Sequence, residues 1–496
     1  MYRLIIYFLL VLVGVSILLS VLKIIQFSPI DITFTSFYFT FACWVINKIF
    51  AKIFKVGTNL ESSLITGLIL SLIVGPSQFP NDLLFLTAVA ALAMASKYLI
   101  VWKSKHIFNP AAFGAVASAV ILGHGASWWI GVPQMMPVII LGGLLIMKKI
   151  HRWEIVLPYL LVILVSQIIG AFGMGLSLET SLQSIFYLFF SSLLFFVFVM
   201  LPEPLTSPPT KNLRVLFALV VGFSGIAIQT IFPNIYYNLE LSLLIGNMFA
   251  AVASPQFRQV FKLKKKTEIA PGVIEFHWEP FTKFNFKAGQ YLEWTLPHKN
   301  PDSRGVRRDF TISSSPTENF IQLTSKFYEK PSTFKQALRV LEIGDEIIGS
   351  RLGGEFSLPE NKDQKLVFIA GGIGVTPFRS MIKYLSDQGE VRDIVLLYSN
   401  KLKKDIVYKE LFDRVKGVRP VYVLTDEKPA GWKGRLGFID EKMIKEEVPD
   451  FKERLFYVSG PEPMVEAFEK MLAGMGLPKA QIKRDYFPGY TDTHQR

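Results

Sequence analysis

The 496-residue sequence contains one cysteine, Cys43, and only six histidines. One cysteine cannot form an intrachain disulfide, and an iron–sulfur cluster ligated by cysteine needs about four thiolates. A structural zinc site built from cysteines is excluded for the same reason. The chain alone therefore carries none of these groups, and we predict no bound metal.

Charged residues are also scarce, at 19%, whereas hydrophobic residues make up 51% and phenylalanine alone fills 42 positions. The apolar runs are concentrated between Met1 and about Pro255, and the rest reads as a soluble sequence. A membrane half joined to a soluble half is therefore predicted. The net charge of +13 would suit nucleic-acid binding. No basic recognition motif occurs, however, and lysines in cytoplasmic loops explain the charge, so we predict no nucleic-acid partner.

The membrane half predicts an all-α transmembrane bundle, because a spanning helix needs about 20 mostly apolar residues. About ten candidate segments follow one another, at 3–24, 33–54, 62–75, 82–102, 109–123, 134–149, 153–172, 181–201, 213–231 and 239–253. With a cytoplasmic N-terminus, nearly all lysines and arginines fall in inward loops, as the positive-inside rule requires. The outward loops hold acids instead, namely Asp31, Asp82, Glu179 and Glu240. We expect an integral multi-pass protein, surrounded by membrane lipid, whose soluble half is cytoplasmic.

The first motif of the soluble half is "RRDFTISSSP". On a strand, Arg308 and Phe310 share a face, and a bend would bring the hydroxyl of Thr311 to the same place. An arginine suits a diphosphate and an aromatic ring covers an isoalloxazine, so the motif is either a flavin site or an ordinary strand end. In "KPSTFKQAL", Ser332 and Thr333 begin a helical pattern, where they would bind a phosphate or simply cap the helix.

A glycine-rich turn follows the apolar run in "LVFIAGGIGVTPFRSM". Gly371, Gly372 and Gly374 come after the predicted strand, and Thr376 and Pro377 open a helix. Glycines between a strand and a helix let the backbone approach a pyrophosphate. Two more strand-and-turn units, "DIVLLYSN" and "RLFYVSGPEPMV", predict an α/β domain with a parallel sheet and a ligand beyond the carboxyl ends of its strands.

The order of these motifs resembles the ferredoxin–NADP reductase superfamily over nearly the whole soluble half. The resemblance implies an antiparallel β-barrel that binds FAD, here residues 256–360. It implies a nicotinamide-binding domain of the α/β parallel-sheet type at residues 361–496. The implied activity is hydride transfer from NADH or NADPH to FAD.

Within that resemblance, Thr311 and Ser459 take the catalytic positions. Ser459, Gly460 and Pro461 stand where many members have Cys-Gly-Pro, so the role of Ser459 stays open. Phe487 belongs to "DYFPGY", which resembles the aromatic C-terminal end of the superfamily. The choice between NADH and NADPH also stays open, because the lysines after "YSN" suit a 2′-phosphate or a solvated turn.

The membrane half resembles the RnfD component of the Rnf complex and its relative, the corresponding membrane component of the sodium-translocating NADH:quinone reductase. The segments that carry this resemblance are "SKYLIVWKSKHIFNPAAFGAVASAV" (96–120), "VMLPEPLTSPPT" (199–210) and "LLIGNMFAAVASP" (243–255). It implies a transmembrane electron-transfer domain over residues 1–255. It also implies an FMN esterified to a threonine, for which Thr180 is the candidate. The alternative is that Thr180 caps a helix beginning at Ser181.

Asn109, in the Asn-Pro-Ala segment, would either cap a helix or hydrogen-bond the edge of a membrane flavin. The leading hypothesis is a membrane-bound flavoprotein that passes electrons from NAD(P)H through FAD to a membrane flavin or a quinone-type acceptor, with further electron-transfer subunits as candidate partners. A haem-containing ferric reductase or NADPH oxidase type is the runner-up. It needs paired histidines inside helices, and only His106, His124 and His151 lie in this half. A transporter or scaffold that senses nicotinamide redox state is the third hypothesis.

Overall fold

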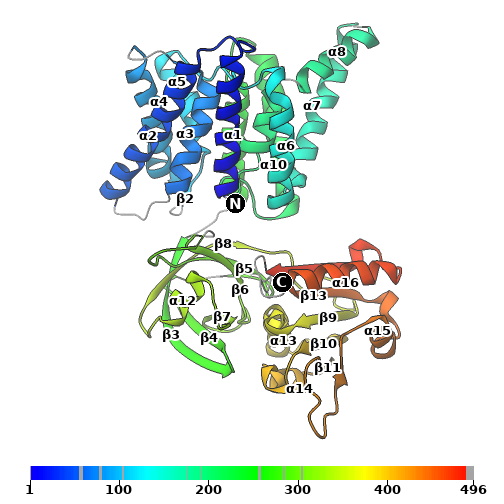
Figure 1. Ribbon diagram of the computed structural model, residues 1–496. Coiled ribbons are helices and arrows are strands. Elements are labelled where there is room, and N and C mark those ends of the chain that lie inside the picture. Colours follow the sequence, from blue (N-terminus) through cyan, green and yellow to red (C-terminus); the bar gives the residue numbers. More distant parts are fainter. Residues whose placement is uncertain are drawn as a thin grey trace. The chain divides into compact units, whose positions relative to one another are not determined.

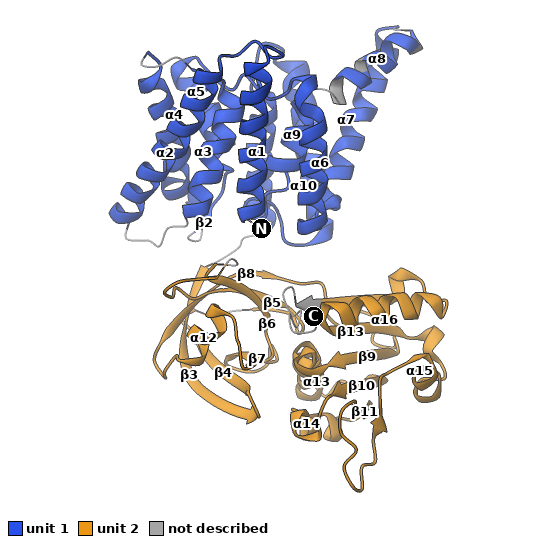
Figure 2. Cartoon of the chain, in the orientation of Figure 1, with its two compact units in different colours: residues 1–257 blue, residues 258–496 orange. Residues whose placement is uncertain are grey.

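The structure, a computed structural model, describes residues 2–54, 60–77, 81–102, 105–175, 177–189, 192–254, 258–282, 285–302 and 305–487. The chain divides into two compact units, residues 1–257 and 258–496 (Figures 1 and 2). The first unit is helical, and the second contains two sheets.

The helices of the first unit overlap the apolar segments predicted from the sequence. They are α1 (Tyr2–Val21), α2 (Pro29–Ile53), α3 (Leu60–Val74), α4 (Leu83–Leu99), α5 (Pro110–Leu122), α6 (Met136–Ile150), α7 (Trp153–Gly173), α8 (Leu178–Phe189), α9 (Leu193–Phe195), α10 (Lys211–Ile231) and α11 (Asn238–Ala253). A short hairpin, β1 (Val101–Trp102) and β2 (Lys105–His106), connects α4 to α5. The segment predicted as one helix at 181–201 contains most of α8, then α9 and a π-helix at Phe196–Met200.

Five stretches in the described part of the first unit are long and apolar enough to cross a membrane. They are Arg3–Val21, Pro29–Ile53, Pro133–Ile150, Trp153–Gly173 and Lys211–Ile231. Four further apolar helices, α3, α4, α5 and α11, have 10–17 residues, which is short for a span. The first unit therefore has the character of a membrane domain, and the count of ten spans stays a prediction.

The first sheet of the second unit is antiparallel throughout. Its strands are β3 (Arg258–Ala270), β4 (Val273–Pro280), β5 (Tyr291–Thr295), β6 (Arg307–Thr311), β7 (Ile321–Lys326) and β8 (Glu346–Gly353), in the order β6-β5-β8-β3-β4-β7. Alternate residues face a core that includes Trp278 and Trp294, as a half-buried strand requires. Just beyond β6, the Ser313 N–H donates to the carbonyl of Gln322 on β7 at 2.8 Å, so a hydrogen bond connects the two edge strands of the sheet. Closure into a barrel stays a prediction.

The second sheet is parallel and lies between helices (Figure 1). Its strands are β9 (Leu366–Gly371), β10 (Ile394–Asn400), β11 (Val418–Leu424), β12 (Arg435–Leu436), β13 (Leu455–Pro461) and β14 (Ile482–Phe487). Its helices are α13 (Thr376–Gln388), α14 (Lys409–Arg414), α15 (Glu441–Glu447) and α16 (Glu462–Gly474). The strand β9 is apolar along its length because apolar clusters pack on both of its faces.

The order of this sheet, β12-β11-β10-β9-β13-β14, contains one reversal. The chain runs from β9 outward to β12 and then returns to the other side of β9 as β13. The carboxyl ends of β9 and β13 therefore flank a topological switch point, where open α/β sheets bind their ligands.

Candidate functional site

The switch point brings together the two nicotinamide motifs predicted from the sequence. In the parallel pairing of β13 with β9, Ser459 lies opposite Ala370, directly before the glycine-rich turn. A Cβ atom on Gly374 would overlap the Ser459 carbonyl oxygen, so the turn rests on the end of β13. Two segments almost ninety residues apart thus lie side by side at the carboxyl ends of the central strands.

The glycines of the turn have different surroundings. Gly372 has a positive φ of 52°, and no atom lies within 4 Å of the place where a Cβ would stand. Its backbone therefore borders open space, and its role in binding a ligand stays a prediction. Gly374 was expected to face the same ligand, but it packs against Ser459 instead, and Gly371 packs against Met464. Those two positions need glycine for close packing within the protein.

Thr376 and Pro377 open α13, as the sequence predicts. The Thr376 hydroxyl donates to the Ile373 carbonyl at 3.2 Å, so it stabilises the turn. The N–H groups at the start of a 13-residue helix attract anions. This end of α13 is therefore suited to the pyrophosphate of a dinucleotide.

Ser459 is fully buried, and its hydroxyl has no hydrogen-bond partner among the described residues. A buried hydroxyl without a partner costs free energy, which a ligand amide could recover. Its neighbours Gly460 and Pro461 end β13, and an added Cβ on Gly460 would lie 3.0 Å from the Met464 sulfur. Phe487 lies opposite Pro461 on β14, and residues 488–490 of its motif fall outside the described residues.

The flavin motif lies on β6, at the edge of the antiparallel sheet. The Arg308 guanidinium donates to the Asp302 carboxylate at 2.8 Å and lies 5.5 Å from the ring of Phe334. The ring of Phe310 is 5.7 Å from the same phenylalanine. Thr333 completes the group, because its hydroxyl oxygen accepts the Asp302 N–H at 3.0 Å. Arg308 and Phe310 thus lie close to Thr333, which is distant from them in the sequence.

Ser332 is the N-cap of the short helix α12 (Thr333–Arg339), and its side chain accepts the Lys335 N–H at 3.4 Å. This is the capping role that the sequence allowed. A role of Ser332 in holding a flavin phosphate stays a prediction.

Thr311 and Ser459 are connected through a residue that the sequence did not single out. The Thr311 hydroxyl hydrogen-bonds the carboxyl group of Asp485 on β14. Asp485 in turn lies opposite Ser459 in the pairing of β14 with β13. Burial raises the pKa of Asp485 to about 7, and the charge of Asp309 adds to this effect, while the Thr311 hydrogen bond opposes it. The only sequence signal was its place at the start of "DYFPGY".

Asn109 belongs to a polar cluster inside the helical unit. It caps α5, since its side-chain oxygen accepts the Ala112 N–H at 3.0 Å. Its amide nitrogen donates to the Glu203 carboxylate at 2.8 Å, and its backbone N–H donates to Asn247 at 2.9 Å. Thr206 donates to the same Glu203 oxygen at 3.0 Å. Asn109 therefore fills the capping role and also joins three chain segments.

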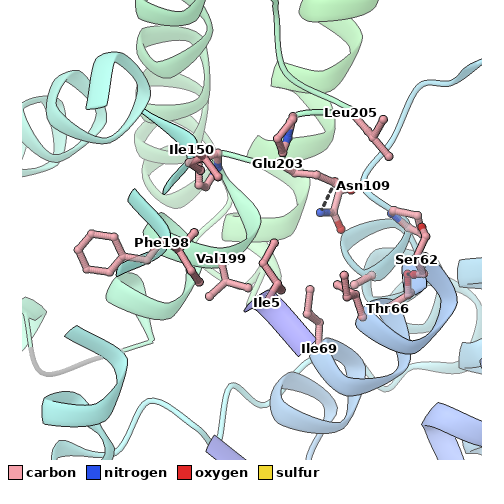
Figure 3. Close-up of a pocket in the computed structure, with 16 residues that line it drawn as sticks. Ile5, Ser62, Thr66, Ile69, Asn109, Ile150, Phe198, Val199, Glu203 and Leu205 are labelled. Atoms are coloured by element: carbon pink, nitrogen blue, oxygen red, sulfur yellow. Dashed lines mark hydrogen bonds between the residues drawn. The ribbon is translucent and has the colours of Figure 1, made fainter. Parts of the chain in front are cut away.

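Asn109 and Glu203 of this cluster line one side of a pocket, and Figure 3 shows them hydrogen-bonded beside it. The remaining lining is largely apolar and includes Ile5, Ile69, Ile150, Phe198 and Val199. Ser62 and Thr66 add hydroxyls, and both accept from the ammonium group of Lys97, at 3.3 and 3.2 Å. The pocket thus has a polar side and an apolar side.

Thr180 is exposed and lies within the first turn of α8, which begins at Leu178. The hydroxyl of Ser177 accepts the Thr180 N–H at 3.2 Å. The alternative in which Thr180 caps a helix from Ser181 is therefore wrong, because Ser177 holds the capping position. Thr180 is not among the residues that line the pocket around Asn109. Within the described part of the chain, no group of three or more His, Cys, Asp or Glu side chains could hold a metal ion.

Comparisons with known proteins give the class of each part of the chain. Residues 118–260 match the NQR2, RnfD, RnfE family. Residues 368–470 match the oxidoreductase NAD-binding domain. Both resemblances drawn from the sequence are thus confirmed, as are the enzyme class, an NAD(P)H-dependent flavin oxidoreductase, and the cofactors FAD and NAD(P)H.

Individual relatives match only part of the chain. It is 28% identical to the glycine betaine monooxygenase reductase subunit of Chromohalobacter salexigens, over 41% of this chain and 56% of that protein. It is also 28% identical to NADH-cytochrome b5 reductase 1 of Pyricularia oryzae, over 50% of this chain and 86% of that protein. Among solved structures, an Amycolatopsis cytochrome P450 reductase aligns with a TM-score of 0.42 and 23% identity, over 47% of this chain and 70% of that one.

Proposed function

We propose that this chain is a membrane-bound oxidoreductase that takes a hydride from NAD(P)H in its second unit and passes electrons to a membrane flavin or quinone-type acceptor in its first. The observation that carries the first step is the position of Gly372 and Ser459 at the switch point, with Thr311 of the other sheet connected to the strand beside Ser459 through Asp485. Gly372 has open space beside its backbone, and Ser459 has a buried hydroxyl without a partner among the described residues. The hydroxyl of Thr311 hydrogen-bonds Asp485.

Each residue of the site has a separate task. Gly372 and the start of α13 bind the pyrophosphate of the nicotinamide dinucleotide. The Ser459 hydroxyl orients the nicotinamide amide, and Thr311 presents a hydrogen bond where the hydride is accepted. Arg308 neutralises the diphosphate of FAD, and Phe310 packs along its ring system. FAD, when bound, accepts two electrons as a hydride and releases them one at a time.

The pocket beside Asn109 supports the second step. A redox ring with polar edge atoms would meet Asn109 and the hydroxyls of Ser62 and Thr66 on one side and apolar side chains on the other. A membrane flavin and the ring of a quinone both combine polar edge atoms with an apolar body. Residues 1–255 would then be the electron-transfer domain, and residues 256–360 and 361–496 the cytoplasmic FAD and NAD(P) domains.

The haem alternative loses support in the described structure. His106 lies in β2, His124 in the loop after α5, and His151 directly after α6, so none of the three lies within a helix. Stacked haems between helices need histidines on facing helices. A spectrum without a Soret band would agree.

The test uses the full chain purified in detergent. We expect extractable FAD, oxidation of NADH or NADPH with a soluble dye, and reduction of an added quinone. Each coenzyme is assayed separately, which also decides between them. Dye reduction without quinone reduction would contradict the membrane step. A flavin-containing protein that oxidises neither coenzyme would favour the redox-sensing scaffold instead.

A further inference from the structure

The flavin motif and the nicotinamide turn lie in different domains of the second unit, and two residues of α13 connect them. Arg379 donates to the Ser313 carbonyl at 3.1 Å and to both carboxylate oxygens of Glu318. Ser380 donates to the Ser314 carbonyl at 2.5 Å. We call Arg379, Ser380 and Glu318 the inter-domain clamp. It rests on two consecutive carbonyls of the flavin motif, those of Ser313 and Ser314.

The residues of the clamp are close in sequence to the flavin motif's Thr311 and to the start of α13. Ser313 lies two residues after Thr311, and Arg379 lies three residues after Thr376, which is one turn along the same face of α13. Any movement of α13 relative to β6 would therefore shift the nicotinamide turn relative to Thr311. The clamp fixes this separation from both domains.

The acceptor side of the clamp is itself held rigidly. Ser313 and Ser314 hydrogen-bond to Gln322 on β7 through both backbone and hydroxyl groups, at 2.8–3.0 Å. Glu318 accepts the Ser315 N–H at 2.6 Å, which fastens its carboxylate to the same loop. The loop cannot easily follow α13 if the helix moves.

A second contact of the same kind lies nearby. The hydroxyl of Tyr408, which follows β10, lies 2.8 Å from the Thr324 hydroxyl and accepts from the Gln322 amide at 3.1 Å. Tyr408 has a positive φ of 61°, a conformation that a non-glycine residue adopts at a cost. Its ring lies 5.8 Å from the Arg379 guanidinium. The strained backbone of Tyr408 thus occurs at a residue whose side chain hydrogen-bonds across the two domains.

Stability alone does not account for the clamp. The side chains of Arg379 and Glu318 are only 11% and 13% exposed, and the Arg379 Nε is buried without a hydrogen-bond partner among the described residues. Buried ion pairs contribute little net stability, since removing both charges from water offsets their attraction. Directional hydrogen bonds between two domains instead select one relative position, which apolar packing would not.

We infer that Arg379, with Glu318 and Ser380, is a positioning residue that sets the distance between the nicotinamide turn and the flavin motif for hydride transfer. The inference rests on the proposed function and names a residue set that acts through the geometry of the site. Since misplacement by about 1 Å can cost roughly a hundredfold in rate, loosening the clamp should slow flavin reduction without weakening coenzyme binding.

The test measures flavin reduction by stopped-flow absorbance in the full chain at saturating coenzyme. In Arg379→Met we expect the rate to fall about ten- to a hundredfold, with FAD content unchanged and the coenzyme Kd within about threefold of wild type. Arg379→Lys should recover part of the rate. The matched control is Arg454→Met, because Arg454 is also a buried arginine in a bidentate pair, with Asp393 at 2.8 and 2.9 Å, but within one domain.

Each outcome has a defined meaning. An unchanged rate in Arg379→Met, or an equal fall in Arg454→Met, would overturn the inference. Loss of FAD in both Arg379→Met and Glu318→Gln would also overturn it, since the pair would then hold the fold. If the wild-type protein itself failed to oxidise NAD(P)H, the proposed function would fail instead, so the two failures are distinguishable.

Discussion

Single residues at the switch point face opposite constraints. Gly372 and Gly374 lie two positions apart in one turn, yet the first borders open space and the second touches the backbone of β13.

Ser459 and Glu240 are both fully buried, and each has a polar oxygen without a partner among the described residues. Glu240 was expected in an outward loop, but it lies in the first turn of α11 and accepts from the Trp128 indole at 2.9 Å. Hydropathy could not reveal this, because the burial comes from a distant loop.

Substitutions at the two glycines should therefore separate binding from folding. Gly372→Val places a branched side chain at a positive φ and fills the space left for the pyrophosphate, so NAD(P)H oxidation should be lost while FAD stays bound. The strain should cost about 1–2 kcal/mol. Gly374→Ala should instead lower the melting temperature, because its Cβ overlaps the Ser459 carbonyl. Thermal unfolding and coenzyme titration distinguish the two, and equal loss of flavin in both would contradict the assignment.

Asp485 predicts a dependence of stability on pH. Its pKa is raised to about 7 in the folded protein and is about 3.9 in an unfolded chain. Below pH about 4, Asp485 is protonated in both the folded and the unfolded state, so it does not change the free energy of unfolding. As the pH rises toward 7, the unfolded state loses its proton first, so the folded state becomes relatively less stable. Asp485→Asn should thus leave stability unchanged near pH 4 and raise it by about 1–2 kcal/mol at pH 8, since partial exposure screens the charge. Unfolding curves at both pH values check this, and an equal gain at the two would refute it.

At the scale of elements, two helix ends of the first unit meet at one pocket: the start of α5 and the end of the π-helix Phe196–Met200. The π-helix Phe196–Met200 is followed by Pro202 and Pro204, which lack the N–H groups that a continuing helix needs. Glu203, between these prolines, bonds Asn109 at the start of α5. Irregular backbone within a membrane domain occurs where it lines a cavity, and both ends line the same pocket.

Asn109→Ala tests whether this meeting of helix ends serves electron transfer. Loss of the cap should cost about 1 kcal/mol in either case. If the pocket holds the membrane acceptor, quinone reduction should fall selectively while dye reduction by the second unit persists. Ser28→Ala is the matched control, because Ser28 caps α2 and is likewise followed by a proline at the first helical position. Equal retention of both activities would remove Asn109 from the electron path.

The elements themselves were largely predictable, whereas their contacts were not. The apolar run before Gly371 predicted a buried parallel strand, and Asn109 followed by Pro110 predicted a helix start, because both signals are local. Asp485 and Arg379 were missed as functional positions, because their roles depend on the register of β14 and on the docking of α13. Sequence patterns record which face of an element is apolar, but they do not record which distant group it meets.

At the scale of the whole molecule, the chain consists of two units with separate cores. The large apolar cluster of the helical unit draws only on residues before 258, and the three clusters of the second unit only on residues after it. The residues predicted to bind FAD and the nicotinamide coenzyme all lie within residues 308–487. The second unit therefore has the parts of an independent reductase.

A fragment of residues 258–496 should accordingly fold and be yellow without the membrane unit. We expect noncovalent FAD, measured by absorbance after denaturation. Arg308→Ala should weaken FAD binding about ten- to a hundredfold, because a charge-assisted hydrogen bond contributes roughly 1.5–3 kcal/mol. Lys445→Ala, at an exposed pair with Glu441 on α15, is a control that should leave the affinity unchanged. A folded, colourless fragment would contradict the prediction.

The solitary cysteine of this chain has a practical consequence. Cys43 is fully buried in α2, so the native protein presents no accessible thiol to maleimide reagents. A cysteine introduced at an exposed position, such as Phe438→Cys in the second unit or His124→Cys in the first, would become the sole labelled site. Two such cysteines, one in each unit, would accept a pair of spin labels in an otherwise natural chain. The distance between the labels, measured with and without NADH, would then follow any movement that accompanies turnover.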